Sequence, residues 1–351
     1  MTGSRISAGE LRSFAVRAFC AAGLPTSAAE ITSDSLVDAD LRGLDDHGAV
    51  ARLPTYTGRI RAGGVLADAE VTVVADLGAL VTLDAHAAIG QLAAHVGMTH
   101  AIDRARTYGV GVATVADSNH LGVLGYWSAL AARDGLVGFS LSGAGARMPA
   151  WGGAEALLSS SPWSWAFPVA GRDPLVVDLS NTSVVWMVFA EAARRGESLP
   201  PGLALDAEGR ATTDPDAAMR GLTLPFGGAK GGALSLAMEV LCTAFAGGAT
   251  SVDVPALTDL DRPQRLGQLF MALRPDAAAA DAAFGTRVAD LIAAIEGSRP
   301  AAGFDGVRVP GQRRDIAAAE RTTQGIPVAS ARLEALDDLA STLSVDPVVR
   351  H

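Results

Sequence analysis

Two histidines of this chain lie in short polar segments that are bounded by glycine. His120 lies in segment 117–122 and follows the apolar run 111–116, which has the pattern of a buried strand. A helical pattern begins after Gly125, so His120 should stand at the carboxyl end of a strand, where open α/β sheets place their ligands. Alternatively, the imidazole caps the next helix or bonds a main-chain carbonyl, as a lone histidine often does.

The second histidine, His47, directly follows Asp46 and precedes Arg52 and Tyr56. An imidazole beside a carboxylate can take up and release a proton near neutral pH, and an arginine can bind a carboxylate through two parallel hydrogen bonds. This set predicts acid–base chemistry on a small acid, with His47 and Asp46 as catalytic residues and Arg52 and Tyr56 as substrate-binding residues. The alternative is a plain helix start with Asp46 as N-cap and Arg52 in solvent. The other histidines are three in alanine-rich stretches typical of helices and one at the chain end: His86, His95, His100 and His351.

A nucleotide cofactor needs donors for its phosphates, and the common glycine-rich motifs for this task are missing. Gly109 and Gly111 lack the third glycine of a Rossmann motif because Thr114 stands in its place. A P-loop fails as well, since a glycine rather than Ser or Thr follows Lys230. Segment 227–232 nevertheless carries Lys230 between glycines at a helix start, where free amides and the ammonium could hold a phosphate. A loop with a surface lysine is the open alternative.

The elements that must position these residues alternate between strands and helices, which indicates an α/β fold. Helical patterns cover 7–23, 27–40, 90–108, 127–133, 281–296 and 330–343, with a further helix after Lys230. Strand patterns cover 71–74, 80–83, 110–115, 137–141, 175–178 and 268–273. Ser27 and Glu30 have the spacing of a capping box, and the polar, proline-rich stretch 197–216 is typical of an exposed loop.

The composition agrees with a cytoplasmic enzyme of two lobes. A chain of 351 residues that is 49% hydrophobic can bury a large core. The 28 basic and 38 acidic residues give a net charge of −10 without a basic block, which argues against nucleic acid as a partner. Cys20 and Cys242 show no ligand spacing, so we expect reduced thiols and no metal site. No stretch approaches the ~20 apolar residues of a membrane span, so we expect no membrane partner.

The order of these segments resembles the type 2 malate/L-lactate dehydrogenase family, which includes ureidoglycolate and sulfolactate dehydrogenases, 2,3-diketogulonate reductase and the Δ1-piperideine-2-carboxylate reductases. The resemblance spans nearly the whole chain. The motifs that carry it, in chain order, are Asp40-Leu41-Arg42-Gly43, segment 84–91, Ser118-Asn119-His120, Trp151-Gly152-Gly153, Thr213-Asp214-Pro215, Lys230-Gly231, Pro310-Gly311 and Gly325-Ile326.

The family resemblance implies an NAD(P)-binding α/β fold of the malate/L-lactate dehydrogenase type that is unrelated to the Rossmann fold. It further implies a helical substrate lobe built from residues 1–70 and 310–351 around a nucleotide-binding lobe of residues 71–309. The expected reaction is NADPH- or NADH-dependent reduction of a 2-oxo acid or cyclic imino acid, or the reverse oxidation. The expected partners are a small carboxylate substrate and a second copy of the chain in a homodimer.

The resemblance also assigns roles to single residues. His47 would exchange the proton with the substrate, Arg52 would bind its carboxylate and Ser160 would contact it. The residues that would line the nicotinamide and phosphate path are His120, Leu121 and Gly122. Those that would hold the rest of the nucleotide are Asp178, Leu179, Ser180 and Lys230, with Pro310 and Gly311 in a late loop over the adenosine end.

Three departures from the family pattern bear on the site. Asp46 replaces a serine, and Arg52 follows His47 by five residues instead of four. The extra residue would turn a helical side chain by about a hundred degrees unless it lies before the helix. The family's Gly-Thr-Asn-Pro reads Ser159-Ser160-Ser161-Pro162 here, and a charged triplet reads Trp186-Met187-Val188.

Val188 cannot provide the acid that supports the catalytic histidine in some relatives. We therefore hypothesise that Asp46 either supports His47 or faces a cationic group on the substrate. The lost charges also leave open a divergent member that no longer binds nicotinamide and serves as a non-redox enzyme or a binding protein.

Overall fold

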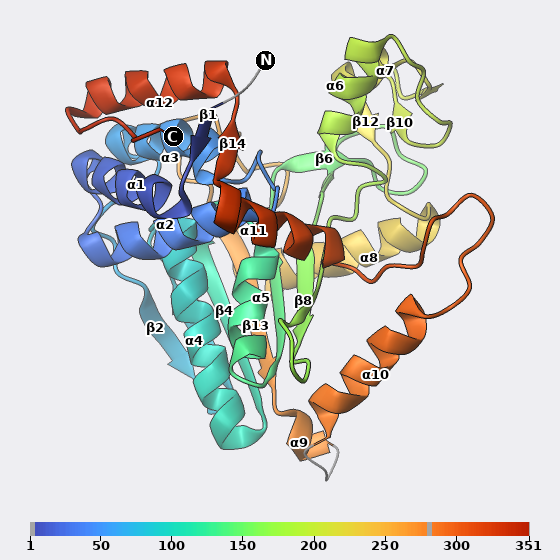
Figure 1. The fold of residues 1–351 in the computed structure, drawn as a ribbon, viewed down its shortest axis with the longest axis horizontal. Helices are drawn as coiled ribbons and strands as arrows, with labels where there is room; N and C mark the ends of the chain where they lie inside the picture. Colours follow the sequence, from blue (N-terminus) through green and yellow to red (C-terminus); the bar gives the residue numbers. More distant parts are fainter. Residues whose placement is uncertain (1–3, 279–282, 351) are drawn as a thin grey trace.

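A seven-stranded mixed sheet forms the centre of the molecule, with strand order β2-β3-β4-β13-β5-β8-β9. This computed structural model describes residues 4–278 and 283–350, and Figure 1 shows their arrangement. β3 and β4 are parallel, and the other neighbouring strands are antiparallel. In sheet order the strands are β2 (Thr72–Asp76), β3 (Leu80–Asp84), β4 (Val110–Ser118), β13 (Leu266–Leu273), β5 (Val137–Ser142), β8 (Trp163–Phe167) and β9 (Leu175–Leu179).

Helices α4 (Gly90–Tyr108) and α5 (Leu124–Arg133) cover one face of this sheet. α4 approaches β4 very closely, because a Cβ on Gly111 would lie 1.9 Å from the carbonyl oxygen of Ala101. Gly109 ends α4 in the left-handed conformation with a φ of 83°. Gly109 and Gly111, which do not belong to a dinucleotide-binding motif, therefore allow α4 to end and to pack closely on β4.

The opposite face of the sheet packs against the helical segment that follows Lys230. Along β13, Phe270 points toward α4, whereas its neighbour Leu269 packs against Cys242, as the alternation of side chains along a strand requires. Cys242 belongs to a π-helical turn, η1 (Leu241–Phe245), which continues α8 (Ala229–Val240). Both cysteines of the chain are free thiols.

Segments from both ends of the chain share a separate helical core. Strand β1 (Ser4–Ile6) pairs with β14 (Ile326–Val328), and buried side chains such as Phe14, Leu53 and Leu336 belong to one apolar cluster. The helices of this layer are α1 (Ala8–Ala22), α2 (Thr26–Leu41), α3 (Ala49–Ala62) and α12 (Ser330–Leu343), and α11 (Gln312–Gln324) crosses from it toward the sheet (Figure 1).

The remaining elements lie beside the central sheet. A small three-stranded sheet, in the order β11 (Ala211–Thr212), β10 (Ala204–Leu205) and β12 (Leu222–Thr223), packs with α6 (Trp186–Arg195) and α7 (Pro215–Arg220). Two short strands, β6 (Ala146–Met148) and β7 (Leu158–Ser159), form a separate pair. Helices α9 (Pro275–Ala278) and α10 (Phe284–Glu296) follow β13.

Most predicted elements are confirmed, and α4 and α12 begin and end at the predicted residues. Three local predictions are wrong. The stretch 197–216 is not a plain loop, because it contains β10, β11 and the start of α7. The Ser27 capping box is absent, because α2 begins at Thr26 behind Pro25 and has no side-chain cap. His86 lies in a turn with a φ of 46° and not in a helix. The part of the predicted helix at 281–282 lies outside the described residues.

In the described ranges 4–278 and 283–350, no helix is long and apolar enough to cross a bilayer. Among the same residues, no group of three or more His, Cys, Asp or Glu side chains is placed to hold a metal ion.

Candidate active site

The structure brings His47, Tyr56 and His120 together where α3 meets the end of β4. The rings of His47 and His120 are stacked, with centroids 6.2 Å apart and an interplanar angle of 26°. The hydroxyl oxygen of Tyr56 lies 2.6 Å from Nδ1 of His120. His120 follows β4 by two residues, so its predicted place at the carboxyl end of a strand is confirmed. Two polar segments that are far apart in sequence therefore form one cluster.

The hydrogen bonds of His120 define which ring nitrogen carries the proton. The main-chain N–H of Gly122 donates to Nδ1 over 3.3 Å, and an N–H group can only donate, so Nδ1 is an acceptor. Burial, assisted by His47 and Arg52, lowers the pKa of His120 to about 3, while burial raises the pKa of Tyr56 to about 12. The neutral ring therefore accepts from the Tyr56 hydroxyl at Nδ1 and keeps an N–H donor at Nε2.

His47 lies in a turn before α3, with its main-chain N–H donating to the carbonyl oxygen of Leu44 over 2.8 Å. Burial and then the charge of Arg52 lower the pKa of His47 to about 4, Asp46 opposes this shift, and Arg314 adds to it. An imidazole with this pKa is neutral at pH 7 and can accept a proton from a substrate hydroxyl.

Arg52 lies in the first turn of α3, and the extra residue that separates it from His47 does not turn its side chain away from the histidines. The helix begins at Ala49, so the extra residue between His47 and Arg52 is accommodated before the helix starts. The Nε–H of Arg52 is buried without a hydrogen-bond partner among the described residues. Since its charge also lowers the pKa of both histidines, Arg52 offers a partly buried cation close to two imidazoles.

Asp46 is about half exposed, and its carboxylate lies 3.9 Å from the guanidinium of Arg332. The alternative role of Asp46 as an N-cap is wrong, because Gly48 occupies the N-cap position of α3. The carboxylate of Asp46 raises the pKa of His47, as the supporting role requires. The second role, facing a cationic group on the substrate, stays a prediction.

We expect Asp46→Ser to lower the pKa of His47 further. The acid limb of the kcat/KM profile for oxidation should then move to lower pH by a fraction of a pH unit, because solvent screens this half-exposed carboxylate. The matched control is Asp34→Ser on α2, whose carboxylate pairs with Arg12 at the surface. Identical profiles for the parent and Asp46→Ser would remove Asp46 from the support of His47.

Asn119, to which the sequence analysis assigned no role of its own, fixes the segment that carries His120. The side-chain amide donates to the carbonyl oxygens of Ala87 and Ala88, both over 3.0 Å. Its oxygen accepts from Arg59 and from the main chain of Gln264, each over 3.1 Å. Because these partners come from three separate parts of the chain, only the position of Asn119 beside His120 in the sequence indicated that it holds this segment.

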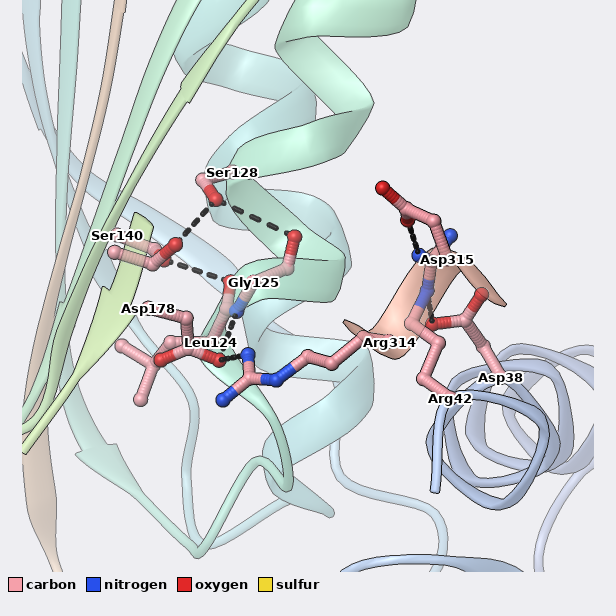
Figure 2. A network of polar contacts seen from close by, with 10 residues as sticks. Asp38, Arg42, Leu124, Gly125, Ser128, Ser140, Asp178, Arg314 and Asp315 are labelled. Carbon is pink, nitrogen blue, oxygen red and sulfur yellow. Dashed lines mark hydrogen bonds and ion pairs between the residues drawn. The ribbon is translucent and has the colours of Figure 1, made fainter. Parts of the chain in front are cut away.

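Asp178 is engaged by groups of the protein itself. Its carboxylate accepts from the main-chain N–H of Gly125 over 3.2 Å and from Arg314 over 3.4 Å, as Figure 2 shows. Burial raises the pKa of Asp178, and the Arg314 charge opposes this. In the same view Arg42 bonds Asp38 and Asp315, which fastens α11 to α2. Contact of Asp178 with a nucleotide remains a prediction.

The predicted nucleotide segments around Ser160, Ser180 and Lys230 are neighbours in space. The N–H of Asn181 donates to the carbonyl oxygen of Ser160 over 2.8 Å, which joins the first two segments. The carbonyl oxygen of Asn181 accepts from Phe226 over 2.9 Å, which joins them to the turn before Lys230. Ser180 itself bonds the hydroxyl of Thr182, with an oxygen–oxygen distance of 2.8 Å, and the neighbouring Leu179 is exposed.

Lys230 stands exposed in the first turn of α8 and is the only lysine among the 28 basic residues of the chain. It has no ion-pair partner within the part of the chain that the structure describes. The glycines beside it shape a tight turn, since a Cβ on Gly231 would lie 1.9 Å from the carbonyl oxygen of Phe226. An unpaired ammonium at a helix start fits a phosphate group.

The last predicted cofactor segment, Pro310 and Gly311, precedes α11. Gly311 has a φ of 87°, and a Cβ there would lie 3.2 Å from the carbonyl oxygen of Val176 on β9. The segment thus rests on the strand that carries Asp178. The altered triplet starts α6 with exposed side chains, of which Trp186 is 46% and Val188 38% exposed. Ser161 adopts a φ of 39°, in the left-handed region, which asparagine tolerates better than serine does.

Comparison with known proteins identifies the family. A family profile described as malate/L-lactate dehydrogenase matches residues 6–337. This chain belongs to the malate/L-lactate dehydrogenase family. It is 36% identical over 317 residues to (2R)-3-sulfolactate dehydrogenase (NADP(+)) of Chromohalobacter salexigens, covering 90% of this chain and 92% of that protein. It is 32% identical to ureidoglycolate dehydrogenase (NAD(+)) of Escherichia coli strain K12, with 92% of each covered.

Solved structures agree with this membership of the malate/L-lactate dehydrogenase family. Sulfolactate dehydrogenase from Methanocaldococcus jannaschii superposes with a TM-score of 0.92 at 29% identity, covering 97% of this chain and 98% of that one. Δ1-Piperideine-2-carboxylate reductase from Pseudomonas syringae gives 0.86 at 30% identity, covering 96% and 99%. The predicted family and fold are confirmed, and the chain is an oxidoreductase.

Proposed function

We propose that this member of the family interconverts a 2-hydroxy acid and the corresponding 2-oxo acid with NAD(H) or NADP(H), and that His47 exchanges the proton. The observation that carries this proposal is the partly buried cluster of His47, His120 and Arg52 at the end of β4. It combines a neutral base, a fixed N–H donor and a cation that has no ion-pair partner among residues 4–278 and 283–350, and these are the groups that the reaction requires.

Each protein group has a defined part in the oxidation. Arg52 binds the substrate carboxylate through its guanidinium, and His47 takes the proton of the hydroxyl as the carbonyl forms. The Nε2–H group of His120 is left to donate a hydrogen bond to an oxygen atom of the bound substrate or cofactor. A bound nicotinamide would supply the hydride acceptor for this oxidation. In the reverse direction protonated His47 gives its proton to the carbonyl oxygen, which becomes the hydroxyl, and its low pKa makes it a strong acid for that step.

The names of the relatives support the proposed substrate class. The sulfolactate, malate and ureidoglycolate dehydrogenases and the piperideine-2-carboxylate reductase are named for acids. A 2-oxo acid or a cyclic imino acid could therefore be reduced in this site, with Arg52 on the shared carboxylate. We further propose that residues 1–70 and 310–351 form the substrate lobe around residues 71–309.

Nicotinamide fluorescence distinguishes the proposed oxidoreductase from a divergent family member that no longer binds nicotinamide. The purified protein should bind NADPH or NADH with a dissociation constant below about 1 mM. It should then reduce at least one member of a panel that contains oxaloacetate, 3-sulfopyruvate, pyruvate and Δ1-piperideine-2-carboxylate. Absence of binding for both cofactors up to about millimolar concentration would favour a non-redox role.

Lys230 permits a direct test of the proposed phosphate position, because no other lysine competes for an amine reagent. Acylation at mildly basic pH should modify Lys230 and the chain's amino terminus, and saturating NADPH or NADH should slow modification of Lys230 by about tenfold or more. The amino terminus, read by mass spectrometry of the same sample, is the internal control. Equal rates with and without cofactor would place Lys230 away from the phosphates.

We also propose that the enzyme is a homodimer. Large apolar side chains are exposed at the start of α6 and along α8, including Trp186 at 46%, Met187 at 47%, Leu236 at 56% and Val240 at 50%. Such side chains are more common in interfaces than on a free surface. Light scattering after size exclusion should give twice the chain mass, and a monomer at all concentrations would contradict this.

A further inference from the structure

Asp40 is a buried carboxylate that the proposed chemistry does not use. It lies near the end of α2 and is 1% exposed. Its Oδ2 accepts the main-chain N–H of Val50 over 3.2 Å, and the adjacent N–H of Ala49 also stabilises the charged form of the carboxyl group. These two N–H groups belong to the first turn of α3, which has no partner for them within the helix. Asp40 therefore caps α3 from another helix.

Gly48 is the residue that makes room for this cap. It occupies the N-cap position of α3 and has no side chain of its own to bind the free amides. A Cβ at Gly48 would lie 2.0 Å from Oδ1 of Asp40. The carboxylate thus fills the space in which a side chain at position 48 would stand. The glycine and the aspartate form one unit.

This cap adjoins the proposed catalytic base. His47 precedes Gly48 directly, and α3 carries Arg52 and Tyr56 in its first and second turns. The same region is held from α11, since Arg321 donates to the carbonyl oxygen of Asp40 over 2.6 Å and pairs with Asp45. Movement of the α3 start would therefore move the base, the carboxylate-binding cation and the partner of His120 together.

We propose that Asp40 is a positioning residue that places His47 and Arg52 by capping α3 from α2. The expected effect of Asp40 on turnover rests on the proposed function, whereas the capping of α3 by Asp40 can be measured by hydrogen exchange without turnover. A charged acceptor at a helix start also interacts favourably with the helix dipole.

The buried charge of Asp40 lowers the stability of the folded protein, which an uncharged acceptor at this position would not do. Burial raises its pKa to about 7, nearby Asp45 raises it further, and the two amide bonds and Arg321 from α11 oppose the shift. The folded protein therefore binds more protons than the unfolded chain between the ordinary carboxyl pKa and about 7. Stability must fall as pH rises through this window, and above about pH 7 the full cost is present.

Asp40→Ala and Asp40→Asn separate positioning from bulk stability, with Asp34→Asn on the same helix as the matched surface control. Asparagine retains an oxygen acceptor, whereas alanine does not. Hydrogen exchange of peptides covering residues 44–53 should accelerate by about tenfold in Asp40→Ala and change by less than about threefold in Asp40→Asn.

Steady-state kinetics should follow the same order. Asp40→Ala should lower kcat by about tenfold or more with cofactor affinity within about twofold, and Asp40→Asn should restore most of kcat. The melting temperature of Asp40→Asn relative to the parent should rise between pH 6 and pH 8.5, since the buried charge is gone. If Asp40→Ala does not fold, Gly48→Ala provides the second test, because its Cβ displaces the carboxylate and should also speed exchange.

Three results would overturn the positioning role. The first is unchanged hydrogen exchange of residues 44–53 in both Asp40→Ala and Gly48→Ala. The second is an equal loss of kcat in Asp40→Ala and Asp40→Asn. The third is a lower melting temperature of Asp40→Ala with its kcat per folded molecule unchanged. If the parent shows no dehydrogenase activity, the proposed function fails, and the exchange data still decide whether Asp40 caps α3.

Discussion

Replacement of His47 by alanine should lower kcat by about 10²–10⁴-fold and leave cofactor affinity within about twofold. His47 is the proposed proton acceptor, and its pKa of about 4 keeps it neutral at the pH where oxidation is assayed. Its removal leaves the hydroxyl proton without an acceptor, whereas the proposed phosphate contacts at Lys230 are untouched. Stopped-flow turnover and nicotinamide fluorescence on the same preparation would separate the two quantities.

The control for His47 is His86→Ala, which removes an exposed imidazole that bonds Thr72 and Asp84 outside the proposed site. This variant should keep the kcat of the parent. A His47→Ala enzyme with parental kcat but weaker cofactor binding would show that His47 serves the nucleotide site and not proton exchange.

The lowered pKa of His47 also affects the stability of the protein. Between pH about 4 and about 6.5 the unfolded chain binds a proton at His47 that the folded protein does not bind. The free energy of unfolding should therefore fall as pH falls from about 6.5 toward about 4.

Replacement of Arg52 by alanine should raise the KM for the acid substrate by about 10–100-fold, the expected loss of a charge-assisted hydrogen-bond pair. The KM for cofactor should stay within about twofold. Arg52→Lys should recover only part of the loss, because an ammonium cannot form the two parallel bonds of a guanidinium. The charge of Arg52 also lowers the pKa of His47, so Arg52→Ala should move the acid limb of the oxidation profile to higher pH.

Arg61→Ala is the matched control for Arg52, because Arg61 lies on the same helix with its side chain in solvent. It should change neither the KM nor the pH profile. If Arg52→Ala raised the KM for cofactor and left that for the acid unchanged, Arg52 would belong to the nucleotide site. An unchanged pH profile would show that the two side chains do not interact in the active enzyme.

The sequence predicts those parts of the fold that depend on local patterns. Helices α4 and α12 have long periodic stretches with clear ends, and their limits coincide with the prediction. The polar segment around His120 follows a continuous apolar strand, so its place at the end of β4 needed no tertiary information. Lys230 between glycines likewise marks the helix start of α8.

The contacts that position the site could not be predicted, because they join residues distant in sequence. Asn119 meets Gln264, 145 positions away, and Arg321 meets the carbonyl oxygen of Asp40, 281 positions away. Strands β10 and β11 have two residues each, too few for a periodic pattern. The Ser27 capping box failed because the N-cap position of α2 lies two residues earlier, at Pro25, whose fixed φ already suits a helix start.

The most direct test of the account is reduction of a 2-oxo acid by the parent enzyme and by His47→Ala, each with NADPH and NADH. Nicotinamide absorbance reports turnover, and nicotinamide fluorescence reports binding in the same samples. We predict that the parent oxidises at least one cofactor with oxaloacetate or 3-sulfopyruvate, and that His47→Ala binds this cofactor equally well but turns over at least about 10²-fold more slowly. Equal turnover by both proteins, or cofactor binding by the parent without reduction of any acid in the panel, would contradict the proposed role of this site.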